Sequence, residues 1–390
     1  MTLTTHTARV LLTDLPAQPD LTEREIRERL TATLVRIRAR RPKAGQNAGR
    51  LFDMGSEQIV DDLNELLYAD ADDAAPLSMA DQAKIHDRAK RYIIRRNASL
   101  NSSLSHLKDP ERKVLLAAAA AGFRATGVLS GDQVDERIAA LHADFPWLAP
   151  ASVAVMQHLR LRCAPAARPA HLPPLLLVGP PGVAKSTWAR RLADIFSLVP
   201  VLIDIGATSG ATFAISGVER GWSSAAPGRV ISTMLRERVA NPVVILDEID
   251  KIPDSVGTNR GSFPSAFEVL KSMIEPASAG NWICPFYQLP FDLTGVSWIM
   301  TTNSIDHLPP AFLDRVRVIE VGRPSEGQLM KLAAQLVAQQ MDGSDHEQVL
   351  ELIRGMLHQR QRSHRITSLR TLQKMIESLC ARLTAPGFMH

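Results

Sequence analysis

The fold of this chain is decided by the stretch Leu175-Leu176-Leu177-Val178-Gly179-Pro180-Pro181-Gly182-Val183-Ala184-Lys185-Ser186-Thr187. It consists of an apolar strand, a Gly/Pro-rich turn and Lys-Ser at the start of a helix, which predicts a phosphate-binding P-loop. Free N–H groups at such a helix start converge on one point, and the helix dipole adds positive potential there. We therefore expect Gly179 to Thr187 to bind a nucleotide, with Lys185 at the β- and γ-phosphates and the Ser186 hydroxyl on Mg²⁺.

One position departs from the usual P-loop pattern. Ala184 stands where a glycine normally precedes the lysine. If the backbone at this position needs a positive φ, an alanine is strained by roughly 1 kcal/mol. A cost of this size still allows the loop to form.

A second buried strand is predicted at residues 242–247 and ends in acidic residues. Its apolar run is continuous, as in a strand buried on both faces of a parallel sheet. Carboxylates at the carboxyl end of such a strand face the crevice where ligands bind. Asp247 is therefore placed to hold Mg²⁺ through water, and Glu248 to orient or deprotonate the attacking water. Considered without the P-loop, the same run is equally a strand that ends in solvated acids.

Two further polar residues follow predicted strands or helices. Asn303 ends an apolar strand at residues 296–303, where its amide could hold the attacking water or touch the γ-phosphate. A turn-forming asparagine at a strand end is the alternative. Arg315 follows a short helix and precedes another strand, and could reach a phosphate held by a neighbouring subunit. Composition alone favours a surface ion pair for this arginine.

These segments together resemble the AAA+ ATPases, and within them the ATPase module of Lon proteases. The resemblance is carried by Leu246-Asp247-Glu248-Ile249-Asp250-Lys251-Ile252, Ser265-Ala266-Phe267-Glu268-Val269-Leu270, Leu289-Pro290-Phe291-Asp292-Leu293-Thr294, Thr302-Asn303-Ser304-Ile305-Asp306 and Phe312-Leu313-Asp314-Arg315. It covers residues 170 to 385, approximately. It implies that Lys185 and Ser186 belong to Walker A, that Asp247 and Glu248 form Walker B, and that Asn303 is sensor 1. It also implies a trans-acting arginine finger at Arg315 and a cis-acting sensor 2 at Arg370.

The resemblance also singles out a tryptophan in the segment 206–228, which is rich in Gly, Ser, Ala and Thr. The matching Lon stretch carries an aromatic residue that projects into a central pore and grips substrate. Gly221 and Trp222 are therefore the candidate substrate pore loop. The alternative is that Trp222 folds back onto its own domain.

The predicted fold class is an α/β P-loop AAA+ module, a parallel sheet with flanking helices, which carries a helical lid and follows an all-α N-terminal region. Alternating strand and helix patterns from Pro174 onward support the parallel sheet. We expect a tail and basic helix at 1–44, an all-α domain at 45–165, the α/β subdomain at 166–322 and the lid at 323–390. Predicted N-terminal helices cover residues 21–41, 58–68, 79–98, 109–123 and 131–143.

Composition bounds the setting of this protein. The chain has 390 residues and a formal net charge of +4, and its basic helix ends at Arg36–Arg41 and Arg88–Arg96 are either solvated faces or partner surfaces. No secretory signal is evident at the N-terminus, and the longest apolar run is too short to span a bilayer. The cysteines lack metal-ligand spacing and suit a reducing cytoplasm, so we expect a cytoplasmic protein without a membrane partner; they are Cys163, Cys284 and Cys380.

The resemblance implies a homo-oligomeric ring, a hexamer in most such proteins, that hydrolyses ATP with Mg²⁺ to remodel or thread a protein client. A Lon protease continues past the lid into a Ser–Lys peptidase domain, whereas this sequence ends at His390, so any peptidase or effector is expected on a separate chain. One alternative is a nucleic-acid-associated AAA+ module of a mobile-element or phage-defence system. Another is a regulatory subunit that binds ATP without hydrolysing it.

Overall fold

The computed structural model describes residues 22–39, 77–125, 130–162, 170–207, 210–253, 256–258, 261–263, 265–340, 346–363 and 368–384. Contacts divide the chain into two units, one of residues 15–120 and one of residues 121–390 together with 1–14. The tail at 1–20, the helix predicted at 58–68 and the arginines at 40 and 41 lie outside the described residues.

The unit of residues 15–120 is helical, as the sequence predicts. It contains α1 (Glu23–Ala39), α3 (Met79–Ser103) and most of α4 (Asp109–Ala121). A capping box opens α1: the Glu25 carboxylate accepts from the Thr22 N–H at 2.8 Å, and the Thr22 hydroxyl accepts from the Glu25 N–H at 3.3 Å. Both α1 and α3 bury apolar side chains and pack together. No helix in the described part of the chain is long and apolar enough to cross a membrane.

The other unit is built on a five-stranded parallel sheet, as predicted. Its strands are β1 (Leu175–Val178), β2 (Pro200–Asp204), β5 (Val243–Asp247), β10 (Ser297–Thr302) and β11 (Arg317–Glu320), in the order β11-β1-β10-β5-β2. The three central strands are buried on both faces, which explains their continuous apolar sequences. The predicted strands are thus confirmed as neighbours in one sheet.

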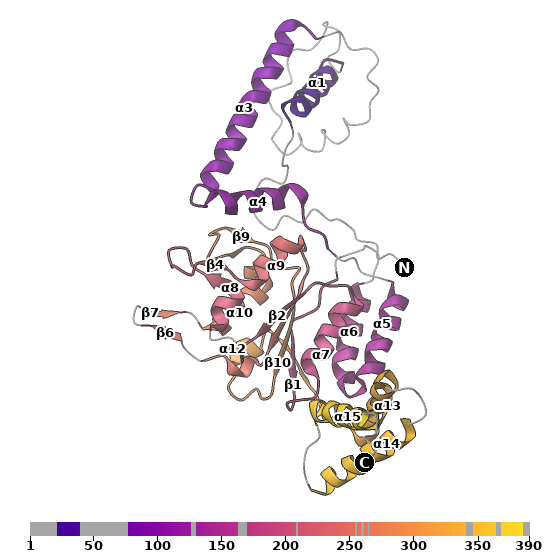
Figure 1. The fold of residues 1–390 in the computed structure, drawn as a ribbon. Coiled ribbons are helices and arrows are strands. Elements are labelled where there is room, and N and C mark those ends of the chain that lie inside the picture. The colour runs from indigo at the N-terminus through magenta and orange to yellow at the C-terminus, as the bar shows by residue number, and fades with distance from the viewer. Residues whose placement is uncertain are drawn as a thin grey trace. The chain divides into compact units, whose positions relative to one another are not determined.

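Helices cover both faces of this sheet (Figure 1). One side carries α5 (Gly131–Asp144), α6 (Ala149–Arg162) and α7 (Lys185–Ile195), and the other carries α8 (Ala211–Ser216), α9 (Arg229–Glu237) and α10 (Ala266–Ile274). Shorter elements are η2 (Pro146–Leu148), η3 (Ile249–Lys251), α11 (Pro276–Ala279) and α12 (Pro310–Leu313). Two-stranded hairpins pair β3 (Gly217–Val218) with β4 (Ala226–Pro227), β6 (Val256–Thr258) with β7 (Gly261–Phe263), and β8 (Trp282–Ile283) with β9 (Pro290–Phe291).

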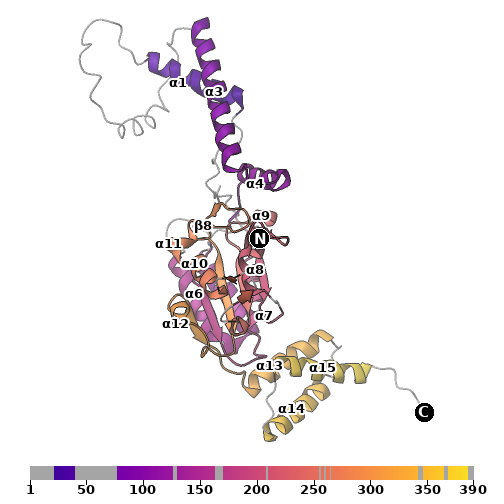
Figure 2. The ribbon, with the colours of Figure 1, turned by 90° about the vertical axis from the view of Figure 1, so that its left-hand side faces the viewer.

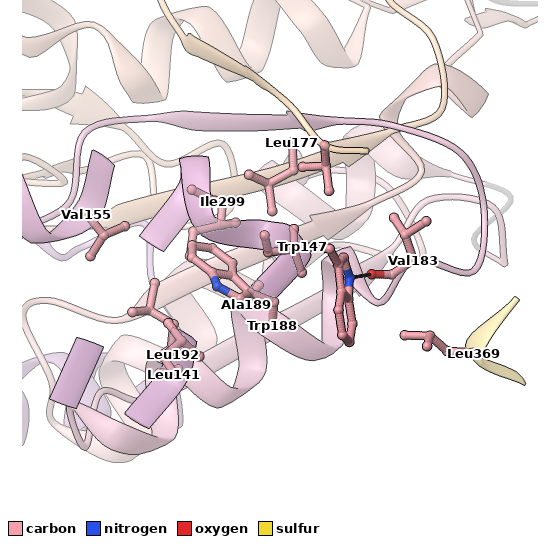
Figure 3. Packing of buried hydrophobic residues seen from close by; sticks show 14 of the residues in the cluster. Leu141, Trp147, Val155, Leu177, Val183, Trp188, Ala189, Leu192, Ile299 and Leu369 are labelled. Atoms are coloured by element: carbon pink, nitrogen blue, oxygen red, sulfur yellow. Dashed lines mark hydrogen bonds between the residues drawn. The ribbon is translucent and has the colours of Figure 1, made fainter. Parts of the chain in front are cut away.

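The helices α5 and α6 share the core of the sheet. Along α5, Val134, Ile138 and Leu141 recur at helical spacing and are buried in the same cluster as Leu177 of β1 and Trp188 of α7 (Figure 3). The division by contacts therefore falls near residue 120, whereas the sequence analysis placed a boundary at 165. The helical pattern alone could not reveal which neighbour α5 and α6 would cover.

The segment 206–228 contains more regular structure than its composition predicts. The short helix α8 buries Ala211, Thr212 and Ile215, and β3 and β4 then form a hairpin. The turn of this hairpin keeps the expected loop character. Small residues are suited to this segment because α8 packs closely on α9 and α10.

The predicted lid consists of three helices. They are α13 (Glu326–Gln340), α14 (His346–Arg362) and α15 (Leu369–Thr384), and they lie together in Figure 2. Their apolar faces meet in buried positions, which include Ala333, Val337, Val349, Ile353, Leu372 and Ile376. This packing makes the lid a small helical bundle.

Leu141→Ala should destabilise the unit that contains the sheet. The side chain is fully buried, and removal of such a leucine side chain costs about 2–5 kcal/mol in lost burial and cavity formation. The measurement is thermal and urea unfolding with and without nucleotide. Leu161→Ala on α6, where the side chain is 80% exposed, is the matched control and should change the stability little. An unchanged nucleotide-stabilised transition in Leu141→Ala would exclude α5 from this core.

Candidate functional site

The register of the parallel sheet brings the P-loop, Asn303 and the predicted Walker B acids to one edge. Val178 at the end of β1 pairs with Thr302 of β10, and Asp247 at the end of β5 pairs with Asp204 of β2. The Gly179 N–H continues the first pairing by donating to the Thr302 carbonyl at 3.2 Å. The P-loop, the turn at Asn303 and the Walker B acids therefore all begin where these strands end.

Lys185 lies at the centre of this edge and is only 7% exposed. Its Nζ donates to the Gly179 carbonyl at 2.6 Å, the Pro180 carbonyl at 3.0 Å and the Asn303 Oδ1 at 3.2 Å. Burial lowers the pKa of Lys185, while the nearby carboxylates of Asp247, Asp250 and Glu248 oppose that shift. The contact with Asn303 joins the P-loop to the end of β10.

The P-loop backbone is strained at Ala184. This residue adopts φ 68° and ψ 30°, in the left-handed region, so the condition under which an alanine is strained at this position is met. The Ala184 methyl packs against the apolar core, which offsets part of the strain. Gly179 is required for a different reason, because a Cβ at this position would lie 2.4 Å from the Val321 carbonyl oxygen. The first N–H groups of α7 have no acceptor within the helix and remain suited to phosphate oxygens.

A tryptophan that the sequence analysis missed supports the loop. The Trp147 indole N–H donates to the Val183 carbonyl at 2.8 Å, and both side chains are buried (Figure 3). This bond fixes the P-loop from η2, which lies 36 positions earlier in the sequence. A Phe-Pro-Trp sequence at residues 145–147, between two Ala-rich helices, was the available signal.

The lid also touches the P-loop. The Leu369 N–H at the start of α15 donates to the Gly182 carbonyl at 3.0 Å. A Cβ at Gly182 would lie 2.6 Å from the Ser368 Cβ, so only glycine allows this approach. Arg370 follows on the first turn of α15 and is exposed. The structure thus brings the helix of Arg370 to the P-loop, but gives no contact between its guanidinium and the other site residues.

Thr301 links the two Walker B acids. Its hydroxyl donates to the Asp247 carboxylate and accepts from the Glu248 N–H at 3.2 Å. Glu248 has a φ of 58°, an uncommon conformation for this residue type that is typical of strained functional sites. Its carboxylate lies beside Gly206, where a Cβ would come within 2.5 Å of Oε2. The sequence pattern gives no sign of this role, because Thr301 lies within a buried strand.

The donor set fits a nucleotide with Mg²⁺. Mg²⁺ prefers hard oxygen ligands and is usually held by one or two protein oxygens, several waters and substrate phosphates. The Ser186 hydroxyl, at the second position of α7, and the Asp247 carboxylate are oxygens of this type. Lys185 supplies the cation that anionic phosphates need.

Arg315 lies on the turn after α12, and no described contact joins it to the P-loop or the Walker B acids. Its Nε donates to the Glu275 Oε2 at 2.8 Å, and its Nη1 donates to the Ala311 carbonyl at 2.6 Å. The surface ion pair that composition favoured is therefore present. A role across a subunit interface remains a prediction.

Trp222 lies in the turn of the β3–β4 hairpin and is 40% exposed. Next to it, Gly221 has a φ of 113°, with no atom within 4 Å of the position that a Cβ would take. Arg220 anchors the hairpin: its Nε donates to the Phe286 carbonyl at 3.2 Å, and its guanidinium lies 4.9 Å from the centre of that ring. The hairpin thus has a fixed base and an open turn.

Comparisons with known proteins agree with this geometry. Residues 175–323 match the model of the ATPase family associated with various cellular activities (AAA). The Lon protease of Mycoplasma pneumoniae is 32% identical over 174 residues, which are 44% of this chain and 21% of that protein. The Lon protease of Bacillus thuringiensis is 30% identical over 220 residues, which are 53% of this chain and 26% of that protein. The chain thus spans between a fifth and about a quarter of the length of these relatives.

Among solved structures, the S. cerevisiae Hsp104:casein complex aligns with a TM-score of 0.44 at 16% identity, over 72% of this chain and 59% of that chain. The family match spans all five strands of the sheet and every residue of the P-loop. The Lon matches reach about 30% identity over 174 and 220 residues. Residues 175–323 therefore match the AAA ATPase family, and the chain is similar to the ATPase part of Lon proteases.

Proposed function

We propose that this protein hydrolyses ATP with Mg²⁺ in an oligomeric ring and uses the energy to remodel a protein client. The observation that carries the proposal is the convergence of Lys185, Asn303 and the Walker B acids at one edge of the sheet. The Lys185–Asn303 bond and the contacts of Thr301 join the start of α7 and the ends of β10 and β5 into one network. A cation, an amide and two carboxylates at one edge are the groups that phosphoryl transfer to water requires.

The proposed roles follow from placement. Lys185 stabilises charge on the β- and γ-phosphates, while Ser186 and Asp247 hold Mg²⁺ directly or through water. Glu248 accepts a proton from the attacking water. At the same time the water oxygen bonds to the γ-phosphorus, and the bond from the γ-phosphorus to the oxygen that bridges it to the β-phosphate breaks. Asn303 orients that water or the γ-phosphate. The P-loop residues Gly179 to Thr187 form the phosphate cradle, and Arg370 reaches it from the lid.

A protein client is supported by two features. The relatives that match are proteases, which act on polypeptides. The β3–β4 hairpin presents an aromatic residue, Trp222, on an anchored base with an open turn. An aromatic side chain in such a turn can grip an extended chain of almost any sequence, because it offers a large contact area with few rotamers to fix.

The test of the proposal is ATP turnover with and without added unfolded protein or duplex DNA. Stimulation by unfolded protein is expected. Stimulation by DNA alone would instead support a nucleic-acid-associated module, and tight ATP binding without turnover would support a regulatory subunit.

Lys185→Ala and Glu248→Gln should separate binding from chemistry. Lys185→Ala should abolish nucleotide binding, because the phosphates lose their nearest cation. Glu248→Gln should keep ATP bound and stop hydrolysis, because the amide cannot take the proton of the attacking water. Equilibrium binding of a fluorescent ATP analogue and phosphate release measure the two effects, with thermal unfolding as a check on folding. Equal loss of binding in both variants would contradict these roles.

Arg315→Ala should reduce turnover by roughly 10³-fold or more, as in other enzymes that use an arginine finger, with little change in ATP affinity. The sharper measurement mixes this variant with Lys185→Ala protein. If Arg315 acts across an interface, some composite sites in mixed rings have all groups intact, and part of the ATPase activity should return. Verified mixed rings with no recovery would argue against action in trans.

Trp222→Ala should leave basal ATP turnover nearly intact and remove its coupling to the client. The side chain is outside the core, so its loss should not disturb the nucleotide site. Unfolding of a tagged fluorescent protein, measured alongside ATP consumption, tests this separation. Ile283→Ala, at another exposed apolar side chain on a hairpin of the same unit, is the control. If Trp222→Ala unfolds the client at the wild-type rate, the proposal that Trp222 grips and threads the client is wrong.

A further inference from the structure

Glu275 stands on a rigid junction between two helices. It ends α10 and precedes α11, with its N–H donating to the Lys271 carbonyl at 3.0 Å. Its own carbonyl accepts from the N–H groups of Ser278 at 3.1 Å and Ala279 at 2.8 Å. Because hydrogen bonds hold both the N–H and the carbonyl of Glu275, the backbone that carries its carboxylate is fixed in place.

The turn that carries Arg315 is fixed to the same helix. Phe312 of α12 is fully buried and packs on Phe267 of α10, with the ring centres 5.1 Å apart. The Arg315 N–H donates to the Phe312 carbonyl at 3.0 Å. The two ends of the Arg315–Glu275 ion pair therefore stand on elements that are packed together.

Two acceptors hold the guanidinium of Arg315, and they leave one of its nitrogens available. Glu275 takes the Nε hydrogen and the Ala311 carbonyl takes a hydrogen of Nη1, while the structure gives no described contact for Nη2. Because a guanidinium is planar and rigid, fixing Nε and Nη1 also fixes where Nη2 points. Nη2 thus keeps its N–H donors for another group.

We propose that Glu275 is a positioning residue that orders Arg315 for the phosphate of a neighbouring subunit. This inference rests on the proposed function of Arg315. An unrestrained arginine loses much rotamer freedom when it is fixed, and the ion pair imposes that order before the nucleotide arrives. Pre-ordering lowers the barrier only if Arg315 contacts the transition state, because only interactions made there raise kcat.

The ion pair with Glu275 could also lower turnover, so the direction of the change in a Glu275 variant decides between the two effects. A carboxylate 2.8 Å from Nε also draws the arginine away from a competing anion. If restraint outweighed order, removal of Glu275 would raise turnover. Order should dominate here because the carboxylate occupies Nε and leaves Nη2 available for the phosphate.

The first experiment compares Glu275→Ala and Glu275→Gln in the assembled ring. Glu275→Ala should lower kcat about tenfold, the ratio that corresponds to ~1.4 kcal/mol in the barrier, with the KM for ATP nearly unchanged. Glu275→Gln keeps an oxygen acceptor for Nε, so it should lose less. Glu237→Gln is the matched control, because Glu237 also pairs with an arginine Nε at 2.8 Å but lies on α9. Thermal unfolding should be similar in all three, since exposed ion pairs contribute little to stability. A kcat that rises or stays at the wild-type value in Glu275→Ala would overturn the proposal.

A double-mutant cycle with Arg315→Ala distinguishes positioning from a separate structural role. If Glu275 acts through Arg315, Glu275→Ala should cause no further loss in the Arg315→Ala background. The same tenfold loss in both backgrounds would overturn the proposal while leaving the arginine finger intact. If Arg315→Ala itself keeps full turnover, the proposed roles of Arg315 and of Glu275 are both wrong. Lys185→Ala still reports whether the site hydrolyses ATP.

Discussion

The parallel pairing of β1 with β10 is the constraint on which the rest of the site depends. Its register sets Val178 beside Thr302, so that Gly179 and Asn303 leave the sheet side by side. Lys185 can then reach back to the Gly179 carbonyl and across to the Asn303 side chain. A shift of one residue would turn every side chain of β10 to the other face and remove Thr301 from the Walker B acids. The chemistry of the edge is thus a consequence of strand register.

The site concentrates backbone strain at two positions, and tertiary contacts hold both. Ala184 and Glu248 adopt left-handed conformations that are unfavourable for their residue types. Near Ala184, the Trp147 indole fixes the preceding Val183 carbonyl, and at Glu248 the Thr301 hydroxyl fixes the N–H. Strain at such positions persists only when the surroundings over-determine the conformation. Trp147 and Thr301 therefore belong to the functional architecture although neither is a candidate for the chemistry.

The sequence predicted the parts of this architecture that depend on local pattern. The P-loop, the buried strands and the helical lid have strong periodicity or composition, and each was found where expected. At Ala184, the departure from the usual glycine indicated strain only on the condition of a positive φ, and the structure supplies that condition. Trp147, Thr301 and Glu275 were missed because their roles come from partners 36, 53 or 40 positions away in the sequence. The attachment of α5 to the sheet was missed for the same reason, since an amphipathic helix does not specify which surface it covers.

The P-loop is the point at which three separate parts of this unit meet. It bonds to η2 through the Val183 carbonyl, to α15 of the lid through the Gly182 carbonyl, and to β10 through Lys185. Phosphate oxygens that draw Lys185 away from Asn303 would alter the third of these contacts, and a change in the loop at Gly182 would reach the lid directly. A conformational change needs a ligand that interacts differently with the two states. Because ATP and ADP differ in the γ-phosphate, which the proposed mechanism sets at Lys185, these contacts would give a short physical route from nucleotide state to lid position. In that route, the hydrogen bond between Leu369 and Gly182 joins backbone atoms only. It therefore depends on the backbone conformation at Gly182 and on the close approach of Ser368, which is possible because glycine has no Cβ.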